Sequence, residues 1–569
     1  MRTLRASSAL AFFLGVLAHI ESLGFWFTSY DSIALIETSR IGSFGDLWSI
    51  LTKPLMYGTT YVEAGKFYRP FVNITYAAEY WIWGLNPFGY HLTNLLLHGL
   101  AAALVVATIY SLTESASIGG LTGVLFAIHP LSVDTVPAIS RRQDILVAVF
   151  GLLMLWLFVE WFRREDARLR AGAVVAYALA LLSKETAIVL GPLAFLWLVL
   201  QQPSLRRLRT YRRGITAVLP LAAVAVAYLV VRTVVLGGIG GYTHEPPLSQ
   251  VLRFPFQYVL ALIYQAHVFA VLRDVSLFLL TVVTVGVSIL YLLLFRHDRS
   301  VHDIGPVSFL FVAIAVGGFG ALTAILVVPG AIMSLNLPNV RSVSWYVVGV
   351  VFAVAATSAV AAALSSKEAV DAGSRRLSAF FVAWLAIPLP LFFVARQFAF
   401  RSAYFFVVPF LALLATYLTA GLSRFDSRRE TGLPRRSTDA VLVFAVVVLL
   451  VPSIAASPLL YTDSGWGESG DITRQALTQV NRSVSEADAN TRVVVVGVPT
   501  KIQHNPKRLG QARKVTMLQP HSLRSWLELQ GHENPVAVGE LHPFVTAPQS
   551  VSVTTDHGNG RLVVRLHYD

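Results

Sequence analysis

The chain has 569 residues, of which 55% are hydrophobic and only 14% are charged. Soluble globular proteins carry about a quarter charged residues, so this composition excludes an ordinary soluble protein, and long continuous apolar runs exclude a β-barrel. The net charge of +13 does not indicate a nucleic-acid partner, because the basic residues sit in short segments between apolar runs. Cysteine is absent, which excludes disulfides and thiolate metal sites.

Apolar windows of roughly 20 residues predict a polytopic all-α membrane protein with about 13 spans. The first run is long and lacks a clear small-residue cleavage site, so we interpret it as an uncleaved span. The predicted spans lie near residues 6–27, 88–112, 117–130, 141–162, 170–183, 185–201, 214–236, 275–296, 305–329, 344–364, 377–395, 402–421 and 438–458.

Clusters of arginine fix the predicted orientation, because positively charged loops stay in the cytoplasm. The basic clusters all fall on one side: Arg2 with Arg5, 163–170, 203–213, 296–299, 367–376 and 423–437. The first loop (28–87), residues 237–273, loop 330–343 and everything after 458 then lie outside the cytoplasm. This arrangement requires 251–273 to be an interfacial or re-entrant segment rather than a span.

The tail from residue 459 differs from the rest of the chain. Residues 471–489 carry apolar side chains at helical spacing, and four short runs rich in valine are typical of strands: 492–498, 535–540, 550–556 and 561–567. We therefore predict a membrane domain over 1–458 and a small α/β extracytoplasmic domain over 459–569.

Polar residues gather at the outer ends of the first spans. Asp31 directly follows the first apolar run, and His91, Asn94 and His98 share one face of the next span. Polar groups in such places are costly unless they line a functional cavity. The stretch from Tyr30 to His98 is therefore predicted to form the floor of an extracytoplasmic site.

Six motifs in a fixed order carry a family resemblance. They are YDSIAL, FYRPFVNITYAAEYWIWGLNPFGYHLTNLLLHGL, LFAIHPLSVDTVPAISRRQDILVAVF, LLSKETAIVL, VRTVVLGGIGGY and FRSAYFFVVPFLALL. Together they resemble the membrane core of the transmembrane and tetratricopeptide-repeat O-mannosyltransferases, and more broadly the GT-C-fold glycosyltransferases that include the protein O-mannosyltransferases. The resemblance covers roughly residues 5–420.

The chain also departs from that family. No tetratricopeptide repeats follow the membrane part. Ser32 follows Asp31 where the family often has a second acidic residue, and Phe400 precedes Arg401 where the family has glutamate. The resemblance implies an inverting transfer of a mannose-like sugar from a polyprenyl-phosphate donor to a hydroxyl on a protein or glycan acceptor, outside the cytoplasm.

Such a transfer needs a base for the acceptor hydroxyl and cations for the departing phosphate. Asp31 occupies the place of the family's first-loop carboxylate and is the predicted base, while Asp134 is the predicted second carboxylate. Glu37 is expected to be a surface residue of the loop. The predicted substrate-binding residues are Tyr68, Arg69, His91, His129, Arg141, Arg142, Lys184, Arg396, Arg401 and Tyr404.

Among these, Arg401 is the leading phosphate ligand, because a guanidinium binds phosphate through two donors. Arg141 and Arg142 occupy the first turn of a helix, where the dipole disfavours cations, and this position favours a role in ligand binding. Lys184 is expected either to pair with the adjacent Glu185 or to bind the lipid phosphate.

Other interpretations stay open from the sequence. They are a GT-C enzyme acting on a lipid or polymer glycan, a secondary transporter, and a non-catalytic membrane scaffold. A transporter predicts inverted repeats and ionisable groups near mid-bilayer, whereas the ionisable groups here cluster at outer ends. No cofactor is assigned, and the two carboxylates and two histidines allow a divalent metal without requiring one. An arginine-rich chain without cysteine is typical of a prokaryotic plasma-membrane protein.

Overall fold

The computed structural model describes residues 2–201, 208–243, 246–251, 254–263, 372–395, 397–431, 457–459, 464–504, 513–542, 545–546, 550–558 and 560–568. The spans predicted near 275–296, 305–329, 344–364 and 438–458 lie in full or almost in full outside these residues. So does Arg396, together with loop 330–343 and the second half of 251–273.

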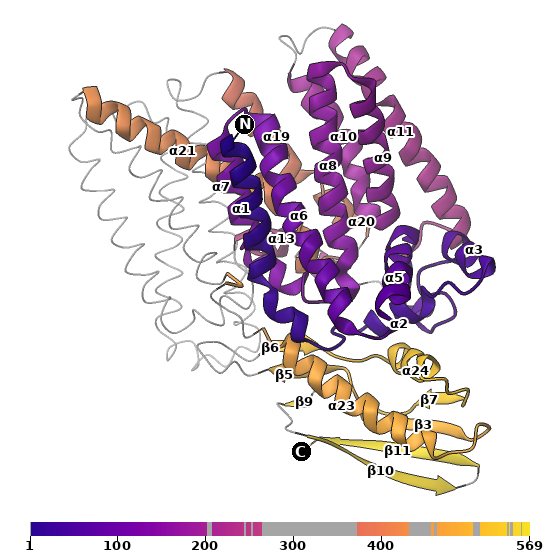
Figure 1. Ribbon diagram of the computed structural model, residues 1–569. Coiled ribbons are helices and arrows are strands. Elements are labelled where there is room, and N and C mark those ends of the chain that lie inside the picture. Colours follow the sequence, from indigo (N-terminus) through magenta and orange to yellow (C-terminus); the bar gives the residue numbers. More distant parts are fainter. Residues whose placement is uncertain are drawn as a thin grey trace.

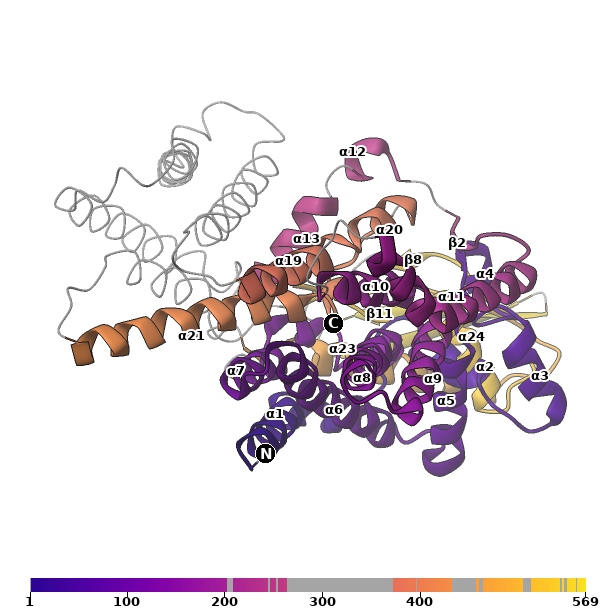
Figure 2. The same ribbon diagram turned by 90° about the horizontal axis from the view of Figure 1, so that it is seen from above.

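Most of the helices that form the body of the protein stand side by side, whereas α21 (Val407–Thr431) runs across them (Figures 1 and 2). The other helices of the body are α1 (Arg2–Ala18), α6 (Pro87–Thr113), α7 (Ala116–Ala127), α8 (Arg142–Arg164), α9 (Ala167–Ser183), α10 (Leu190–Leu200), α11 (Leu208–Leu236), α19 (Ala372–Ala386) and α20 (Leu389–Val394). Short α12 (Leu248–Val251) and α13 (Phe254–Ile263) lie between α11 and α19 in the described sequence.

Four helical stretches of the described residues are long and apolar enough to cross a membrane: Pro87–Thr113, Ala116–Asp134, Ile139–Arg164 and Gly214–Leu236. Each coincides with a predicted span. The chain is therefore an integral membrane protein with a largely helical body. The other described helices that coincide with predicted spans contain shorter apolar stretches, such as Glu185–Leu200 and Val407–Thr419.

Glycine allows three of these helices to approach closely. A Cβ atom added at Gly99 of α6 would lie 2.9 Å from the backbone oxygen of Phe12 in α1. A Cβ atom at Gly119 of α7 would lie 2.9 Å from the backbone oxygen of Val106 in α6. Lipid tails are as apolar as the helix surfaces, so no hydrophobic effect drives the helices together in a membrane. Small residues at the crossings instead let the backbones approach closely. The glycines thus let α1, α6 and α7 pack closely on one another.

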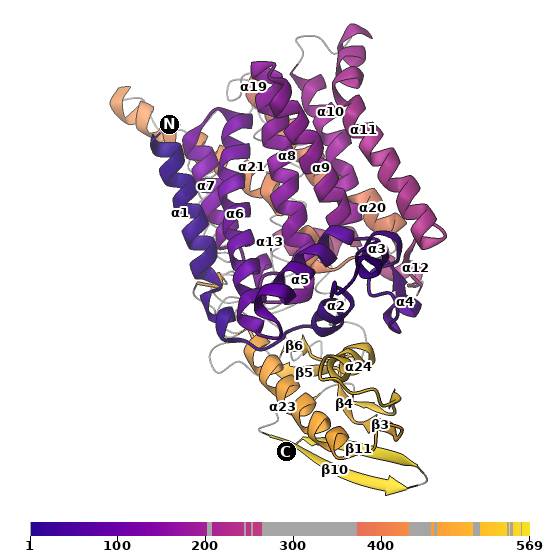
Figure 3. The same ribbon diagram turned by 45° about the vertical axis from the view of Figure 1, so that its right-hand side comes forward.

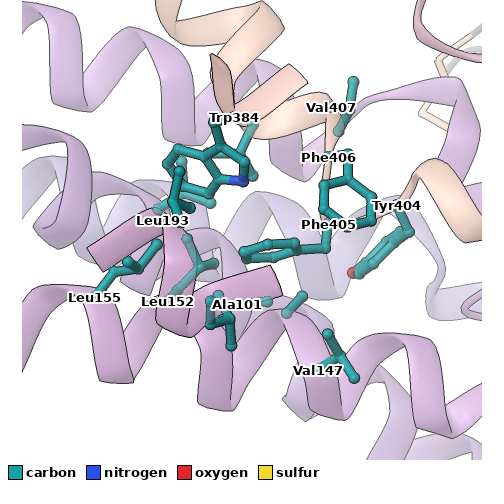
Figure 4. Close-up of a cluster of buried hydrophobic side chains, with 14 of the residues drawn as sticks. Ala101, Val147, Leu152, Leu155, Leu193, Trp384, Tyr404, Phe405, Phe406 and Val407 are labelled. Atoms are coloured by element: carbon teal, nitrogen blue, oxygen red, sulfur yellow. The ribbon is translucent and has the colours of Figure 1, made fainter. Parts of the chain in front are cut away.

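Aromatic and aliphatic side chains fill the space between α8, α10 and α19 (Figure 4). Trp384 of α19 packs against Phe405, with their ring centroids 5.4 Å apart. Leu152 and Leu193 belong to the same buried cluster. This packing holds the segment before α21 against α8, and that segment carries Arg401.

The first helix is shorter than predicted. We expected a span over 6–27, but α1 ends at Ala18 and the chain turns through a 3-10 helix, η1 (Ile20–Gly24). The α-helix ends early because two polar residues, His19 and Ser22, follow it. The Ser22 hydroxyl donates to the His19 carbonyl at 2.8 Å. The His19 ring nitrogen Nε2 also contacts the Ser132 hydroxyl at 2.8 Å.

The predicted first loop folds into several short elements at one end of the bundle. They are α2 (Ser32–Thr38), α3 (Phe44–Thr52), α4 (Tyr61–Ala64), β1 (Gly65–Lys66) and α5 (Pro70–Trp83). Strand β1 pairs antiparallel with β2 (Gly241–Tyr242), which follows α11. A single pairing therefore joins the loop to the end of a distant helix.

The tail combines two helices with short strands at the same end of the bundle (Figure 3). The elements are α23 (Trp466–Ser485), β3 (Arg492–Val496), β4 (Val498–Pro499), β5 (Lys501–His504), β6 (Arg513–Thr516), α24 (Pro520–Leu529), β7 (Val536–Val538), β8 (Leu541–His542), β9 (Val545–Thr546), β10 (Val551–Gly558) and β11 (Arg561–Tyr568). The main sheet has the order β10-β11-β3-β7, with β10 and β11 antiparallel and the other pairs parallel.

The tail is attached to the first loop and to the turn before α8. The indole nitrogen of Trp466 donates to the Val133 carbonyl at 2.9 Å. The Ser522 hydroxyl, at the start of α24, donates to the Tyr30 carbonyl. Trp526 packs edge-on against Trp26, with ring centroids 5.4 Å apart. Buried residues of α2, α23 and β3 belong to one hydrophobic cluster, so the first loop and tail share a core.

Candidate active site

Asp31 stands at the N-cap of α2 but does not cap that helix. An aspartate in this position usually accepts a bond from a backbone N–H of the first turn, yet the side chain of Asp31 makes no such bond. Two contacts fix the preceding backbone: the Thr28 hydroxyl donates to the Pro137 carbonyl at 2.5 Å, and the hydroxyls of Ser29 and Ser140 are 2.7 Å apart. The carboxylate is therefore held in place and left available for another role.

That carboxylate contacts a histidine from the tail. The Nε2 atom of His521, in α24, lies 2.9 Å from Oδ1 of Asp31. The side chain of His521 is 9% exposed and that of Asp31 is 28% exposed. An ionised carboxylate only accepts hydrogen bonds, so His521 is the donor when Asp31 is charged. The sequence analysis missed His521, because nothing in the tail pattern links it to a residue 490 positions away.

Two tyrosines of the first loop lie around Asp31. Burial, and then the negative charge of Asp31, raise the pKa of Tyr30 to about 12. The same two causes raise the pKa of Tyr61 well above its usual value. The ring of Tyr61 also meets the His521 ring edge-on, at 5.7 Å between centroids. Both phenols therefore stay protonated at neutral pH, so neither tyrosine competes with Asp31 as a base.

Asp144 lies among three cations, which are Lys184, Arg401 and Arg141. Its Oδ1 atom lies 2.5 Å from Nζ of Lys184, and its Oδ2 atom lies 4.0 Å from Nε of Arg401. Arg141 is within electrostatic range of Asp144, Arg401 and Asp31. The sequence analysis gave no role to Asp144, which lies in the first turn of α8. The structure places it among the cations that the sequence had singled out.

Lys184 and Glu185 do not pair with each other, which corrects one of the two expectations for Lys184. Glu185 instead makes two bonds to Arg69, at 3.1 Å from Nε and 2.7 Å from Nη2. The backbone at Lys184 is extended, with φ −163° and ψ 139°. Successive side chains on an extended backbone point to opposite sides, so the two neighbours reach different partners.

Arg142, which was predicted as a substrate ligand, is enclosed by protein partners in the structure. It is fully buried, donates to Asn94 at 2.9 Å and to the Tyr90 carbonyl at 3.1 Å, and forms an ion pair with Glu79. Its guanidinium also lies over the Tyr76 ring, 4.4 Å from the centroid. These contacts engage the nitrogens that a phosphate would need.

Three more predicted ligands lie inside the packed core. Tyr404 contacts His98, Tyr68 donates to the Leu51 carbonyl at 3.0 Å, and His91 contacts the Trp26 carbonyl at 3.1 Å. All three side chains are almost fully buried. The structure thus gives them packing roles, because no surface of these groups is open to a substrate.

The remaining predicted residues lie beside the cation cluster. His129 is the N-cap of η2 (Pro130–Asp134), and its ring accepts a bond from the Leu131 N–H at 3.2 Å. Asp134 ends that turn, and its carbonyl accepts a bond from Arg141. The Arg141 guanidinium lies 5.1 Å from the ring centroid of Trp466 in the tail. In the part of the chain that the structure describes, no three His, Cys, Asp or Glu side chains gather as metal ligands would.

A cavity of about 710 Å³ opens between the first loop and the tail. Its walls include Glu37 and Arg40 from the loop, and His521, Arg524 and Glu528 from α24. His521 lines this cavity and also contacts Asp31, which does not itself line the cavity, so His521 stands between the cavity and the predicted base. Glu37 is therefore not the surface residue that we expected, since it is partly buried between α2 and α24.

Glu37 and Glu528, two carboxylates of this cavity, predict a pH-dependent stability. Burial, and then the charge of Glu528, raise the pKa of Glu37 from 4.5 to about 6. The folded chain therefore binds the Glu37 proton more tightly than the unfolded chain. This contribution to stability is fully present below pH 4.5 and is lost as the pH rises through 6.

Glu37→Gln is accordingly expected to raise the melting temperature at pH 7.5 by about 1–2 °C, a value reduced for solvent screening, and to leave it unchanged below pH 4.5. Tryptophan-fluorescence melting of the detergent-purified protein measures both. The control is Glu486→Gln, which removes an exposed carboxylate of the tail and should change neither value. An equal gain at every pH would contradict the assignment.

Sequence comparisons relate the membrane part of the chain to known enzymes. Residues 70–230 match the family described as dolichyl-phosphate-mannose-protein mannosyltransferase. The protein O-mannosyl-transferase Tmtc2 of Drosophila melanogaster is 32% identical over 184 residues, which is 31% of this chain and 20% of that protein. The human protein O-mannosyl-transferase TMTC2 is 29% identical over 149 residues, 26% of this chain and 18% of that protein. The chain thus spans about a fifth of the length of these relatives.

Solved structures give remote likenesses. Archaeal oligosaccharyltransferase AglB from Archaeoglobus fulgidus, in complex with an inhibitory peptide and a dolichol-phosphate, has a TM-score of 0.47 and 13% identity over 94% of this chain and 64% of its own. ArnT from Cupriavidus metallidurans, bound to undecaprenyl phosphate, has a TM-score of 0.33 and 14% identity over 94% of this chain and 85% of its own. The kinship therefore follows from the sequence matches. Over residues 70–230 the chain is a relative of the protein O-mannosyltransferases, and the resemblance predicted from its motifs is confirmed.

Proposed function

We propose that this chain is a GT-C-type membrane glycosyltransferase that moves mannose from a polyprenyl-phosphate donor to a hydroxyl of a polypeptide acceptor, with inversion at the anomeric carbon. One observation carries the proposal: the carboxylate of Asp31 is not used as a helix cap and lies within electrostatic range of Arg141, which in turn is within range of Arg401. The sequence kinship over residues 70–230 supports the choice of donor and sugar.

The proposed reaction is a single displacement at the anomeric carbon. The acceptor oxygen forms a bond to that carbon while the bond to the phosphate oxygen breaks, and Asp31 takes the proton of the acceptor hydroxyl. The lipid phosphate leaves with the bonding electron pair. Arg401 and Arg141 stabilise the charge that develops on it.

Arg401 is the cation best placed to bind the phosphate. Its side chain is 28% exposed and stands 4.0 Å from Asp144, too far for a hydrogen bond, so its donors are not consumed there. Lys184 and Arg69 are already paired at shorter distances, with Asp144 and Glu185. These two cations add positive field and hold the site together.

Arg401→Gln is expected to raise KM for polyprenyl-phosphate mannose by about tenfold to a hundredfold, because a charge-assisted bond to phosphate contributes about 1.5–3 kcal/mol. Turnover of the radiolabelled donor lipid by the full chain in nanodiscs measures this. Arg168→Gln is the matched control, since Arg168 is an exposed arginine near the start of α9. An unchanged donor KM in Arg401→Gln would remove Arg401 from the phosphate site.

His521 is proposed as a positioning residue that acts through Asp31. His521→Ala removes the hydrogen bond that orients the Asp31 carboxylate, so kcat should fall by about tenfold while the donor KM and the melting temperature stay unchanged. His521→Gln keeps a donor and should restore most of the wild-type kcat. A melting temperature that falls together with kcat in His521→Ala, without rescue by His521→Gln, would indicate a purely structural role.

The site is proposed to face away from the cytoplasm. Asp144 and Arg142 begin α8 beside the first loop and the tail, whereas Arg163 and Arg164 end that helix. Basic residues at the far end of a span favour the cytoplasm on that side. The first loop (28–87) and residues 459–569 would then lie on the extracytoplasmic side, with 1–458 as the membrane catalytic domain.

A further inference from the structure

The cavity between the first loop and the tail lies mostly outside the region of sequence kinship. Its loop wall is formed by residues 37–60 and its tail wall by α24 and β7, whereas the family match covers 70–230. The tail wall includes the whole of β7 and the following Gly539. Strand β7 has no part in the chemistry proposed above.

Strand β7 is an edge strand with an orderly set of main-chain groups. It pairs with β3 alone among the described strands of its sheet. The Val493 N–H donates to the Pro535 carbonyl at 2.9 Å, and the Gly539 N–H donates to the Val495 carbonyl at 2.8 Å. With this parallel register, the N–H and C=O of Ala537 face β3. Those of Val536 and Val538 face the opposite, unpaired side.

The side chains around the cavity are polar and of mixed sign. The three carboxylates of Glu37, Asp46 and Glu528 outnumber the two guanidiniums of Arg40 and Arg524, and Arg524 bonds Glu528 at 2.8 Å. A lipid phosphate finds no excess of positive charge here, unlike the cluster around Asp144. A chain that carries its own alternating N–H and C=O groups matches a free strand edge, and a glycan does not.

We propose that this cavity is the acceptor site, and that the acceptor is an extended polypeptide segment that adds as a strand to the free edge of β7. The inference rests on the proposed function and adds to it the binding mode of the acceptor. His521 lines the cavity and contacts Asp31, so the added segment has to extend past His521 to bring a serine or threonine to the base. The donor phosphate is bound separately, by Arg401.

Backbone-methylated acceptors test the binding mode without altering the protein. A pool of short peptides, each with a single threonine, is first screened for mannose transfer by the full chain in nanodiscs. The best acceptor is then N-methylated at one backbone nitrogen at a time. Because alternate N–H groups of a strand face the same neighbour, methylation on one side of the strand should raise the acceptor KM at least tenfold, and methylation on the other side should not.

A protein variant tests the same edge from the other partner. Val538→Pro removes one N–H from the unpaired side of β7, and Val538→Ala removes a similar amount of side chain while keeping that N–H. The proline variant should raise the acceptor KM by about tenfold relative to the alanine variant, with the same donor hydrolysis and the same melting temperature. If Val538→Pro lowers the melting temperature, its effect on the acceptor KM no longer reports on strand addition. The methylated peptides then test strand addition with the wild-type protein.

The outcomes separate the two proposals. Equal effects of methylation at all positions would overturn strand addition, as would donor turnover without transfer to any peptide in the pool. Either result would leave the donor chemistry standing. Failure of the full chain to turn over any donor lipid would instead contradict the proposed function itself.

Discussion

Asp31→Asn is expected to reduce sugar transfer by about a hundredfold to ten-thousandfold, the range that a positioned general base contributes. The amide keeps the size of the side chain but cannot take the acceptor proton. The donor lipid should still bind with wild-type affinity, because the proposed ligand of its phosphate is Arg401 rather than Asp31. Steady-state transfer from polyprenyl-phosphate mannose to peptide, together with a lipid-binding measurement, checks both statements.

The control for this variant is Asp166→Asn. Like Asp31, Asp166 stands at the N-cap of a helix, and it is exposed. It caps α9 by accepting a bond from the Arg168 N–H at 2.8 Å. Its loss should leave transfer within a factor of two or so, since surface changes cost little. Equal transfer by the wild type and Asp31→Asn would show that Asp31 is not the base.

Arg142→Gln is expected to produce the largest loss of stability, about 3–5 kcal/mol, because it leaves the buried Glu79 carboxylate without its cation. The change also removes the bonds to Asn94 and to the Tyr90 carbonyl. These contacts join α8 to α5 and α6. Tryptophan-fluorescence melting and the monodisperse fraction after mild heating, both in detergent, measure the effect.

Arg164→Gln is the matched control for this experiment. Arg164 also pairs with a glutamate, at 2.7 Å from Glu160, but its side chain is 68% exposed. Exposed ion pairs contribute about 0–1 kcal/mol, so this variant should melt close to the wild type. If both variants melted at the same temperature, the Arg142–Glu79 pair would not be the anchor that its burial indicates.

The long helices could be predicted because membrane spans leave a simple signal. The apolar runs near 88–112, 141–162 and 214–236 have the length that a bilayer demands, and each is helical in the structure. Strands β3, β7, β10 and β11 of the tail could be predicted too, since valine-rich runs flanked by turn residues favour strands, whereas β5 and β6 lack such runs and were not predicted. Local composition determines these elements almost alone.

Side-chain partners could not be predicted in the same way. Lys184 and Glu185 are neighbours in the sequence, and pairing between them was a reasonable expectation. The extended backbone separates them, and Asp144 and Arg69 take their places as partners. The choice depends on where α8 and α5 stand, which no local pattern specifies.

The two arginines before α8 show the same limit. An unfavourable helix dipole singled out Arg141 and Arg142 together. Only the fold decides that Arg142 faces Glu79 in the core while Arg141 faces Asp134 and the tail. The contact between His521 and Asp31 was harder still to predict, because the two residues are 490 positions apart in the sequence.

The most direct test of the central claim is the anomeric configuration of the product. The full chain in nanodiscs is given polyprenyl-phosphate mannose labelled at the anomeric carbon and a threonine peptide, and the glycosidic bond is examined by NMR. A single displacement assisted by Asp31 predicts a mannosylated threonine whose anomeric configuration is opposite to that of the donor. A product with the donor's configuration, or bound donor lipid that is never turned over, would contradict the account.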